Sequence, residues 1–540
     1  MEGSATIKRL DHLGLVAGMI DQLGIVEEID RLLPQSLRDR HISIGQGVKA
    51  MVINGLGFNQ RTLYMVSRFF DHLPVDLLIG KDIKAEHLND SVLGRILDDI
   101  YSYGCTKLYS ELAPVLCERL GLKPKTLCMD STDFHVDGAY NSDTEPEADE
   151  RVIHITHGYS RDHRPDLNQV VLNLIVENEA GIALNMQAAS GNATDKTLFR
   201  KTIRDYVSQL QSTYQVAELL MDSAGYTKET LIETGSKINW ISRVPETLKE
   251  AQEALDRHEP MQDLGNGYSC FALTSDYAGI SQRWFVIRSE EAYRKEVITL
   301  KKNYLKKTEQ TLKDFEKLCS EQFSCQADAQ KQFDKFCKKH PYVEISDMTI
   351  KEYAQYGKKG RPAKSDLPSS YYYQIQGQVA CVIADFRAIE QHKGRFILAT
   401  NQLDHEKLPD NEVLEKYKTL SKVERGFRFL KDPQFIAASF FVKKPERVEA
   451  LLFLMTLCLS VYAAIEYKIR QELIIQHETL PNQLNKQVKN PTGRWLFTLM
   501  TGVDVLYLPN AGPLIVNLSE VKQKIIRLMG AAVQKYYLRL

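Results

Sequence analysis

The sequence of 540 residues lacks any excess of basic charge. Its 69 Lys and Arg residues are balanced by 70 Asp and Glu residues, which gives a formal net charge of −1 at pH 7. Bulk charge therefore offers no argument for nucleic-acid binding, and any basic surface must come from local patterning. The shares of hydrophobic residues (43%) and charged residues (26%) are those of a chain that buries sizeable cores, and the length predicts several domains.

Paired cysteines and a secretory signal are also missing. The nine cysteines are scattered without paired short spacings, so we expect a reducing cytosol rather than a secreted disulfide framework. Residues 1–4 show no basic region leading into an apolar core. The most apolar run, residues 450–465, is shorter than the roughly 20 residues of a membrane span. We interpret it as a buried core helix opened by Pro445, because proline suits the first turn of a helix.

Hydrophobic periodicity divides the chain into a helical start and a mixed centre. Residues 1–118 repeat apolar side chains at helical spacing and predict a compact all-helical domain. Short runs rich in apolar residues then predict strands over 126–130, 134–136, 167–176, 217–221 and 238–244. A helical pattern falls between the third and fourth of these runs. Hairpin strands followed by alternating helix and strand predict a mixed α/β sheet.

This pattern is interrupted before it resumes. Between residues 245 and 393, strand patterns flank a long charged helical stretch over 290–339, which we interpret as an insertion domain. A buried strand is expected at 396–400 and a helix at 411–430. From about residue 475 the chain forms a smaller, mostly helical tail.

Two aspartates follow apolar strand residues. Asp130 and Asp222 stand at predicted strand ends, where carboxylates can converge above a sheet while the strands hold them rigid. Asp133 is an alternative to Asp130, because it lies only three residues further along the chain.

The third acid, Glu424, lies on the helix expected over 411–430. Tyr417 precedes it by seven residues and Lys431 follows it by seven. Seven residues rotate a helix to within about 20° of two full turns, so the three side chains share one face. A tyrosine, a carboxylate and a lysine in one stripe suit a metal ligand flanked by phosphate-contacting groups.

The spacing Tyr417-x2-x-x3-Glu424-x6-Lys431 resembles the Tyr-x2-Arg-x3-Glu-x6-Lys signature of bacterial insertion-sequence DDE transposases in the IS-four superfamily. Four further fragments are similar to stretches of these proteins: 129–132, 158–167, 220–224 and 241–245. The resemblance covers about residues 125–245 and 395–450. It departs at Leu420, which stands at the arginine position of the signature.

The resemblance implies an α/β (multidomain α+β) protein. Its ribonuclease-H-like catalytic core would be interrupted by a mixed, largely β insertion and flanked by helical N- and C-terminal domains. The expected segments are a helical DNA-binding domain (1–120), the first part of the core (121–245), the insertion (246–394), the second part of the core (395–472) and a helical C-terminal region that mediates dimerisation (473–540).

The resemblance also implies a transposase that cleaves and joins DNA. Asp130, Asp222 and Glu424 would hold two Mg²⁺ ions, with Mn²⁺ as a substitute, because these cations prefer oxygen ligands. The implied partners are the terminal inverted repeats, target DNA and a second copy of the chain. We expect it to act in the cytoplasm, at the bacterial nucleoid, without a membrane partner.

Tyr417 and Lys431 are candidates for DNA contact. Six further candidates are Arg425, Arg428, Arg161, His163, Arg164 and Trp284. Arg425 or Arg428 could replace the signature arginine. The cluster at residues 161–164 has a solvated hairpin turn as its alternative, and Trp284 either stacks on an unpaired base or packs in a core. Two other functions stay open, a metal-dependent endonuclease that does not join DNA and a domesticated sequence-specific DNA-binding protein.

Overall fold

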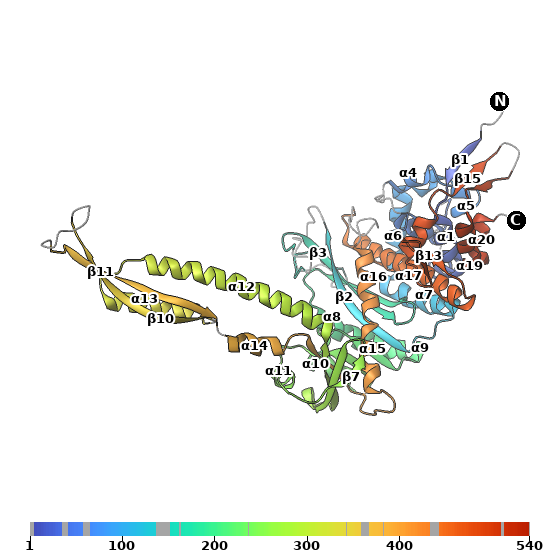
Figure 1. Cartoon of the computed structure of the whole chain (residues 1–540). Coiled ribbons are helices and arrows are strands. Elements are labelled where there is room, and N and C mark those ends of the chain that lie inside the picture. The colour runs from blue at the N-terminus through green and yellow to red at the C-terminus, as the bar shows by residue number, and fades with distance from the viewer. Residues whose placement is uncertain are drawn as a thin grey trace. The chain divides into compact units, whose positions relative to one another are not determined.

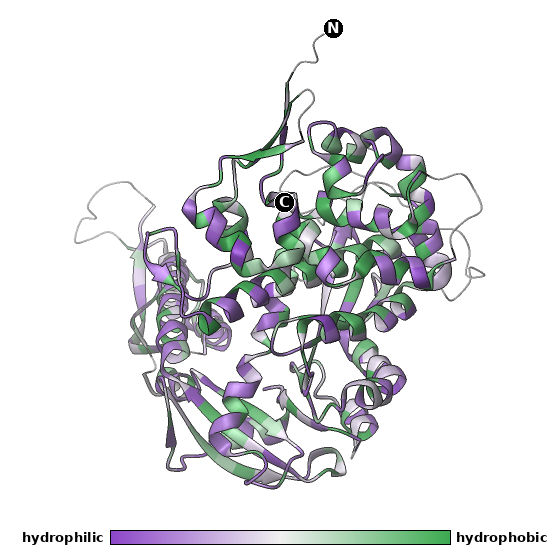
Figure 2. Cartoon of the chain, turned by 90° about the vertical axis from the view of Figure 1, so that its right-hand side faces the viewer, coloured by the Kyte–Doolittle hydropathy of each residue, from purple (hydrophilic) through white to green (hydrophobic). Residues whose placement is uncertain are grey.

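The computed structural model describes residues 5–34, 41–57, 65–136, 152–160, 164–235, 237–341, 343–357, 367–381, 383–431, 442–508 and 512–538. The chain divides into two compact units. The first contains Met1–Arg243, Thr274–Arg283 and Ala399–Leu540, and the second contains Val244–Leu273 and Trp284–Leu398. Figure 1 shows the elements of both units, and Figure 2 shows most helices as mixed green and purple, as expected of elements with one buried face.

The N-terminal part of the first unit is mainly helical. Its helices are α1 (Leu13–Gln22), α2 (Ile25–Leu32), α3 (Ile44–Gly55), α4 (Val66–Phe70), α5 (Val75–Leu78), η2 (Ala85–Leu88), α6 (Asp90–Tyr103) and α7 (Cys105–Leu120). Local sequence fixes several of their ends. Ser43, for example, starts α3 with a capping box, because its hydroxyl accepts from the N–H of Gln46 while the Gln46 side chain accepts from the N–H of Ser43.

The expectation of an all-helical N-terminal region is wrong at its first element. Strand β1 (Thr6–Arg9) pairs antiparallel with β15 (Asp504–Tyr507), which in turn pairs with β16 (Leu514–Val516). The rest of the C-terminal region contains β13 (Leu480–Pro481), β14 (Gln487–Val488), α18 (Gly493–Leu499), α19 (Glu520–Met529) and α20 (Ala531–Tyr537). A four-residue exposed strand has no periodicity of its own to predict it, because it depends on a partner about 500 residues away.

The long helix α17 (Pro445–Ile475) is a core element. It is long and apolar enough to cross a membrane, but 78% of its most apolar window is buried inside the protein. It packs against α1, α3, α6, α7 and α19. This position explains a helix that is apolar on all sides.

The central sheet of the first unit carries strands in the order β4-β3-β2-β5-β6. They are β2 (Thr126–Val136), β3 (Asn168–Glu177), β4 (Ala183–Ser190), β5 (Glu218–Met221) and β6 (Asn239–Arg243). β2, β3 and β4 pair antiparallel, whereas β5 runs parallel to both β2 and β6. The expected strands at 126–130 and 134–136 are one continuous strand. The sheet is therefore mixed, as the sequence predicts.

Helices connect and cover these strands. α8 (Asp195–Thr202), a π-helical turn (Ile203–Val207) and α9 (Ser208–Tyr214) link β4 to β5, and α10 (Lys228–Thr234) links β5 to β6. The helix expected over 411–430 is two helices, α15 (Asp410–Lys418) and α16 (Ser421–Leu430). α16 packs against β2.

The second unit combines strands with long helices. Its elements are α11 (Lys249–Leu255), β7 (Gln262–Gly265), β8 (Tyr268–Ser275), β9 (Gln282–Ser289), α12 (Glu290–Ser320), α13 (Gln326–Lys339), β10 (Val343–Gln355), β11 (Ser370–Cys381), α14 (Ile383–Gln391) and β12 (Arg395–Thr400). The antiparallel ribbon β10–β11 packs with α12 and α13 around a core of its own that includes Phe315, Phe336 and Ile375. The unit is thus less dominated by strands than the family resemblance implies.

Candidate active site

Asp130 and Asp222 lie next to each other on parallel strands. In the register of β2 with β5, Met129 is opposite Met221, so each acid is the next residue along its strand. The Asp130 side chain is 9% exposed, and its Oδ1 accepts a hydrogen bond from the N–H of Ser131 at 2.7 Å. The Oδ1 of Asp222 accepts from the N–H of Ala224 at 2.9 Å and so also caps the turn that follows β5. The sheet brings the two predicted aspartates together.

Glu424 acts electrostatically on the phenol of Tyr417, as the two aspartates do. Burial raises the pKa of Tyr417 above its usual value, and the nearby guanidinium of Arg243 lowers it. Three carboxylates raise the pKa further, those of Asp222, Glu424 and Asp130. The three acids predicted from sequence therefore act electrostatically on one side chain.

The acids converge without forming a closed cluster. Among the described residues, no group of three His, Cys, Asp or Glu side chains stands close enough to hold a metal ion. Glu424 lies on an exposed part of α16, where its side chain has room to turn.

The junction between α15 and α16 keeps Tyr417 and Glu424 on the same side. Thr419 and Leu420 retain right-handed helical backbone angles, and the N–H of Leu420 donates to the carbonyl of Tyr417 at 3.0 Å. The helix thus tightens by a short turn instead of ending. Leu420, at the arginine position of the signature, is 4% exposed and belongs to the core.

Lys431 contacts the second aspartate of β2. Its Nζ lies 3.5 Å from Oδ1 of Asp133, whose side chain is 3% exposed. The other carboxylate oxygen of Asp133, Oδ2, lies 3.5 Å from the Nε2 of His135. The Oγ of Ser160 is 3.2 Å from the same ring nitrogen and accepts from the N–H of Arg164 at 2.8 Å. The C-terminal end of α16 is thereby tied to β2.

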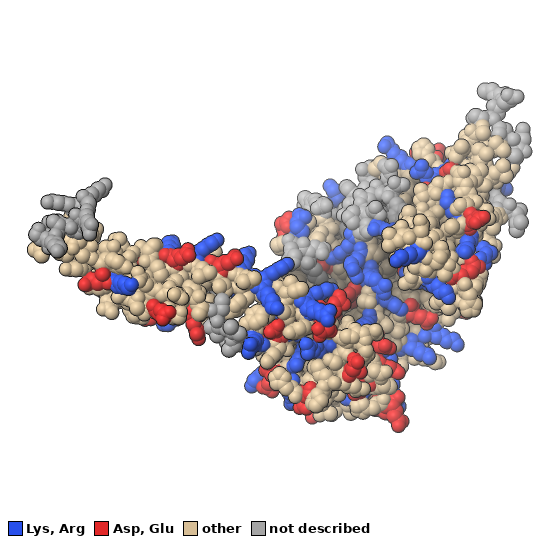
Figure 3. Space-filling view, viewed as in Figure 1, with Lys and Arg blue, Asp and Glu red and all other residues tan. Residues whose placement is uncertain are grey.

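The candidate DNA-contacting residues differ in their surroundings. Arg425 and Arg428 are exposed, and Lys and Arg side chains gather where α16 lies in Figures 1 and 3. Arg164 is exposed and pairs with Asp166 at 2.8 Å. Arg161 and His163 lie outside the described residues.

Trp284 is a core side chain of the second unit. It is 1% exposed, so its ring does not reach the surface. This burial agrees with the core-packing alternative, and stacking on a base would require the ring to leave its place.

Arg243 is a site residue that the sequence interpretation missed. It ends β6, and the register of Ser242 with Met221 places it beside Asp222. The sequence alone gave no signal for it, because its place beside Asp222 depends on the pairing of β6 with β5.

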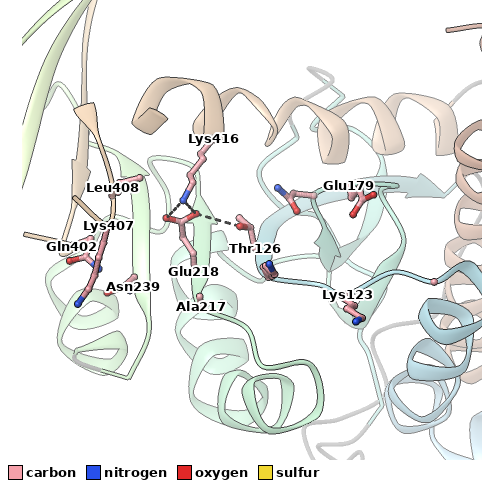
Figure 4. A pocket seen from close by; sticks show the side chains of 13 residues that line it. Lys123, Thr126, Glu179, Ala217, Glu218, Asn239, Gln402, Lys407, Leu408 and Lys416 are labelled. Atoms are coloured by element: carbon pink, nitrogen blue, oxygen red, sulfur yellow. Dashed lines mark hydrogen bonds and ion pairs between the residues drawn. The ribbon is translucent and has the colours of Figure 1, made fainter. Parts of the chain in front are cut away.

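The pocket in Figure 4 lies where β2 and β5 begin, away from the ends of these strands that are closer to the acids. It has a volume of about 700 Å³ and borders Thr126 and Glu218, the first residues of β2 and β5. Glu218 is buried, and Lys416 approaches it to 3.3 Å. Burial raises the pKa of Glu218, and the Lys416 ammonium lowers it. This pocket is separate from the acids, which stand four residues further along each strand.

The first unit thus presents two neighbouring aspartates, Asp130 and Asp222, on a mixed α/β sheet. A model of the family described as "Transposase DDE domain" matches residues 121–461, and the chain belongs to that family. The protein is therefore a DDE transposase, an enzyme of DNA transposition, and DDE transposases generally use divalent metal ions.

Other comparisons add less. Residues 5–114 match a family described as "Domain of unknown function (DUF4277)". The chain is similar to a solved structure described as "Cryo-EM structure of piggyBac transposase synaptic complex with hairpin DNA", with 8% identity, a TM-score of 0.39 and coverage of 92% of this chain and 83% of that chain. No curated protein matches the sequence.

Proposed function

We propose that the protein is a cut-and-paste transposase of the IS-four superfamily, with Asp130, Asp222 and Glu424 as its catalytic acids. It would bind the terminal inverted repeats of an insertion sequence, cleave DNA at the element ends and join them to a target. Membership of the DDE transposase family supports the reaction class. The spacing of Tyr417, Glu424 and Lys431 supports the superfamily, although Leu420 replaces its arginine.

One observation carries the assignment of the acids. Asp130, Asp222 and Glu424 come from two strands and a helix up to 294 positions apart in the numbering, yet all three raise the pKa of Tyr417. The register of β2 with β5 places Asp130 beside Asp222, and the shared effect on Tyr417 supports Glu424 as the third acid. The proposal depends on this convergence.

The sheet supports a ribonuclease-H-like core. Three antiparallel strands are followed by two strands parallel to the first, with β2 between β3 and β5. In this arrangement the first and fourth strands are neighbours, and they carry Asp130 and Asp222.

The donor set fits divalent cations with a preference for oxygen. Asp130, Asp222 and Glu424 would hold two Mg²⁺ ions, with Mn²⁺ as a substitute. Bound there, the ions would activate the attacking oxygen and stabilise the leaving oxygen of an in-line displacement. Arg243 and Lys431 would balance the charge of the DNA phosphates.

Tyr417 would act as a hydrogen-bond donor to a phosphate oxygen. A phenol is protonated at neutral pH even without a shift, and burial and the three acids raise the pKa of Tyr417 further. Arg425, Arg428 and Arg164 would contribute further phosphate contacts. For Arg161, His163 and Trp284, only the sequence pattern supports a contact with DNA.

The remaining parts have proposed roles as well. Residues 1–120 would recognise the inverted repeats, the core of 121–245 and 395–472 would perform the chemistry, and the insertion of 246–394 would support the DNA end. Residues 473–540 would mediate the homodimer that pairs two element ends. The site of action would be the cytoplasm, at the bacterial nucleoid.

Two substitutions test the catalytic assignment. Asp222→Asn and Glu424→Gln keep the side-chain shape but remove the charge that holds the cations. We expect both variants to lose cleavage of labelled element-end DNA with Mg²⁺ while they still bind that DNA in a gel-shift assay. Retained cleavage by either variant would refute the assignment.

The same reaction separates the alternatives. With a target plasmid present, a transposase yields joined products, whereas an endonuclease yields cleaved ends alone. A domesticated DNA-binding protein would bind the ends without cleaving them.

A further inference from the structure

A second buried aspartate lies on the strand of the first catalytic acid. Asp133 follows Asp130 by three residues on β2 and is 3% exposed. No hydrogen bond from the described part of the chain reaches its Oδ2. A buried carboxylate is costly unless a cation compensates it, so the ammonium of Lys431, 3.5 Å from Oδ1, is its natural counter-charge.

The ion pair acts on the helix that carries Glu424. Lys431 is the C-cap of α16, and its N–H donates to the carbonyl of Phe427 at 2.9 Å. Lys431 and Glu424 are two turns apart on the same helix face, offset by about 20°. Lys431 held against β2 therefore fixes the end of the helix that carries the exposed Glu424 two turns earlier.

The other oxygen of Asp133 faces an imidazole without a hydrogen bond to it. His135 Nε2 stands 3.5 Å from Oδ2 and 3.2 Å from the Oγ of Ser160. Each carboxylate oxygen thus already faces a side-chain nitrogen. This arrangement suits a structural counter-charge better than a metal ligand.

We infer that Asp133 is a positioning residue, which holds Lys431 and so sets the rotation of α16 that points Glu424 toward Asp130. This inference rests on the proposed catalytic role of Glu424. It also assigns the two aspartates of β2 different tasks, with Asp130 as a metal ligand and Asp133 as the anchor of α16.

The first test compares Asp133→Asn with Asp130→Asn. The first change keeps shape and removes the charge that holds Lys431, so we expect the single-turnover cleavage rate of element-end DNA to fall about tenfold. The Mg²⁺ concentration that gives half the maximal rate should stay close to the wild-type value, because Asp130, Asp222 and Glu424 are unchanged. Asp130→Asn should abolish cleavage.

A second readout does not depend on activity. Mn²⁺ binding to the DNA-free protein, measured by calorimetry, should be retained by Asp133→Asn and weakened by Asp130→Asn. Loss of Mn²⁺ binding in Asp133→Asn, at an unchanged thermal midpoint, would make Asp133 a ligand and overturn the inference. A wild-type cleavage rate in Asp133→Asn would also overturn it.

A double-mutant cycle tests whether the two residues act through each other. Lys431→Met keeps the apolar stem and removes the charge. If Asp133 works through Lys431, the double variant cleaves no more slowly than Lys431→Met alone, whereas independent roles multiply the two losses. Asp133→Glu, which keeps the charge, should restore most of the rate and serves as the control for folding.

These outcomes separate the two proposals. If Asp130→Asn cleaves like the wild type, the catalytic assignment fails. If Asp130→Asn is inactive and Asp133→Asn is fully active, only the positioning role fails.

Discussion

At the scale of single residues, the pKa of Tyr417 responds to the three acids proposed for the site and to Arg243. Its phenol is half-buried beside Asp130, Asp222 and Glu424, and each of them disfavours the phenolate. Arg243 opposes this effect from the end of β6. DNA bound here, as proposed, would add negative charge and raise the pKa of the phenol further. Its useful property is a hydroxyl that stays a donor.

Leu420 gives the first residue-scale prediction. The superfamily signature has arginine at this position, but the leucine is 4% exposed and packs in the core. We expect Leu420→Arg to lower the free energy of unfolding by about 2–4 kcal/mol, because a charge would enter an apolar place without a partner. We expect no gain in cleavage rate.

Chemical denaturation of the variant, with single-turnover cleavage beside it, checks this expectation. Leu420→Met is the control, since a volume-conserving change usually costs less than about 1.5 kcal/mol. A Leu420→Arg variant that is as stable as the wild type and cleaves faster would show that the position faces DNA after all.

At the scale of elements, the sequence was most informative where one element carries a periodic pattern. The strands that lead to Asp130 and Asp222 could be predicted because apolar runs precede each acid, but the expected end at Asp130 is wrong, because β2 continues to Val136. The face shared by Tyr417 and Glu424 could be predicted from helical geometry. The short turn at Thr419 could not, since it maintains the helical direction and leaves the periodicity almost unchanged.

Contacts between elements could not be predicted from the sequence. Nothing in the pattern of β2 indicates that Asp133 meets Lys431, 298 residues later, because side-chain pairing across the fold leaves no local signal. The same holds for Arg243, whose role depends on which strand lies beside β6. Single elements are local properties of the chain, whereas the site is a property of their packing.

The junction of α1, α3 and α18 predicts a pH effect on stability. His12, at the start of α1, donates from Nε2 to the carbonyl of Leu56 at 2.8 Å and stacks on Phe497 at 4.3 Å between ring centroids. Burial lowers the pKa of His12 from 6.5 to about 4, against an opposing effect of the Leu56 carbonyl. Between these values the unfolded chain binds a proton that the folded chain does not. Stability therefore falls as pH drops below 6.5 until about pH 4, by about 2 kcal/mol at pH 5.

Thermal unfolding at pH 7 and pH 5 measures this effect. His12→Gln retains an N–H donor but does not titrate, so its thermal midpoint should fall less than that of the wild type over the same interval. Equal losses in both proteins would show that His12 is not the group responsible.

At the scale of the whole molecule, the chain builds two units from interleaved segments. The first unit is closed by parts that are distant in sequence, as the pairing of β1 with β15 shows, and its core is organised around α17. The second unit has a separate cluster around Phe315, Phe336 and Ile375. This separate cluster implies that the second unit has a partly independent stability.

Matched truncations, one in each core, test this independence. Phe315 is 4% exposed in the cluster of the second unit, and Leu457 of α17 is fully buried in the first. Phe315→Ala should lower the free energy of unfolding by about 3–5 kcal/mol, and Leu457→Ala should lower it by about 2–5 kcal/mol, because each change leaves a cavity. In differential scanning calorimetry each change should lower a different transition and leave the other near its wild-type temperature. If either substitution lowered all heat absorption together, the chain would unfold as one cooperative body. In that case the acids on β2, β5 and α16 would depend directly on the core of the second unit.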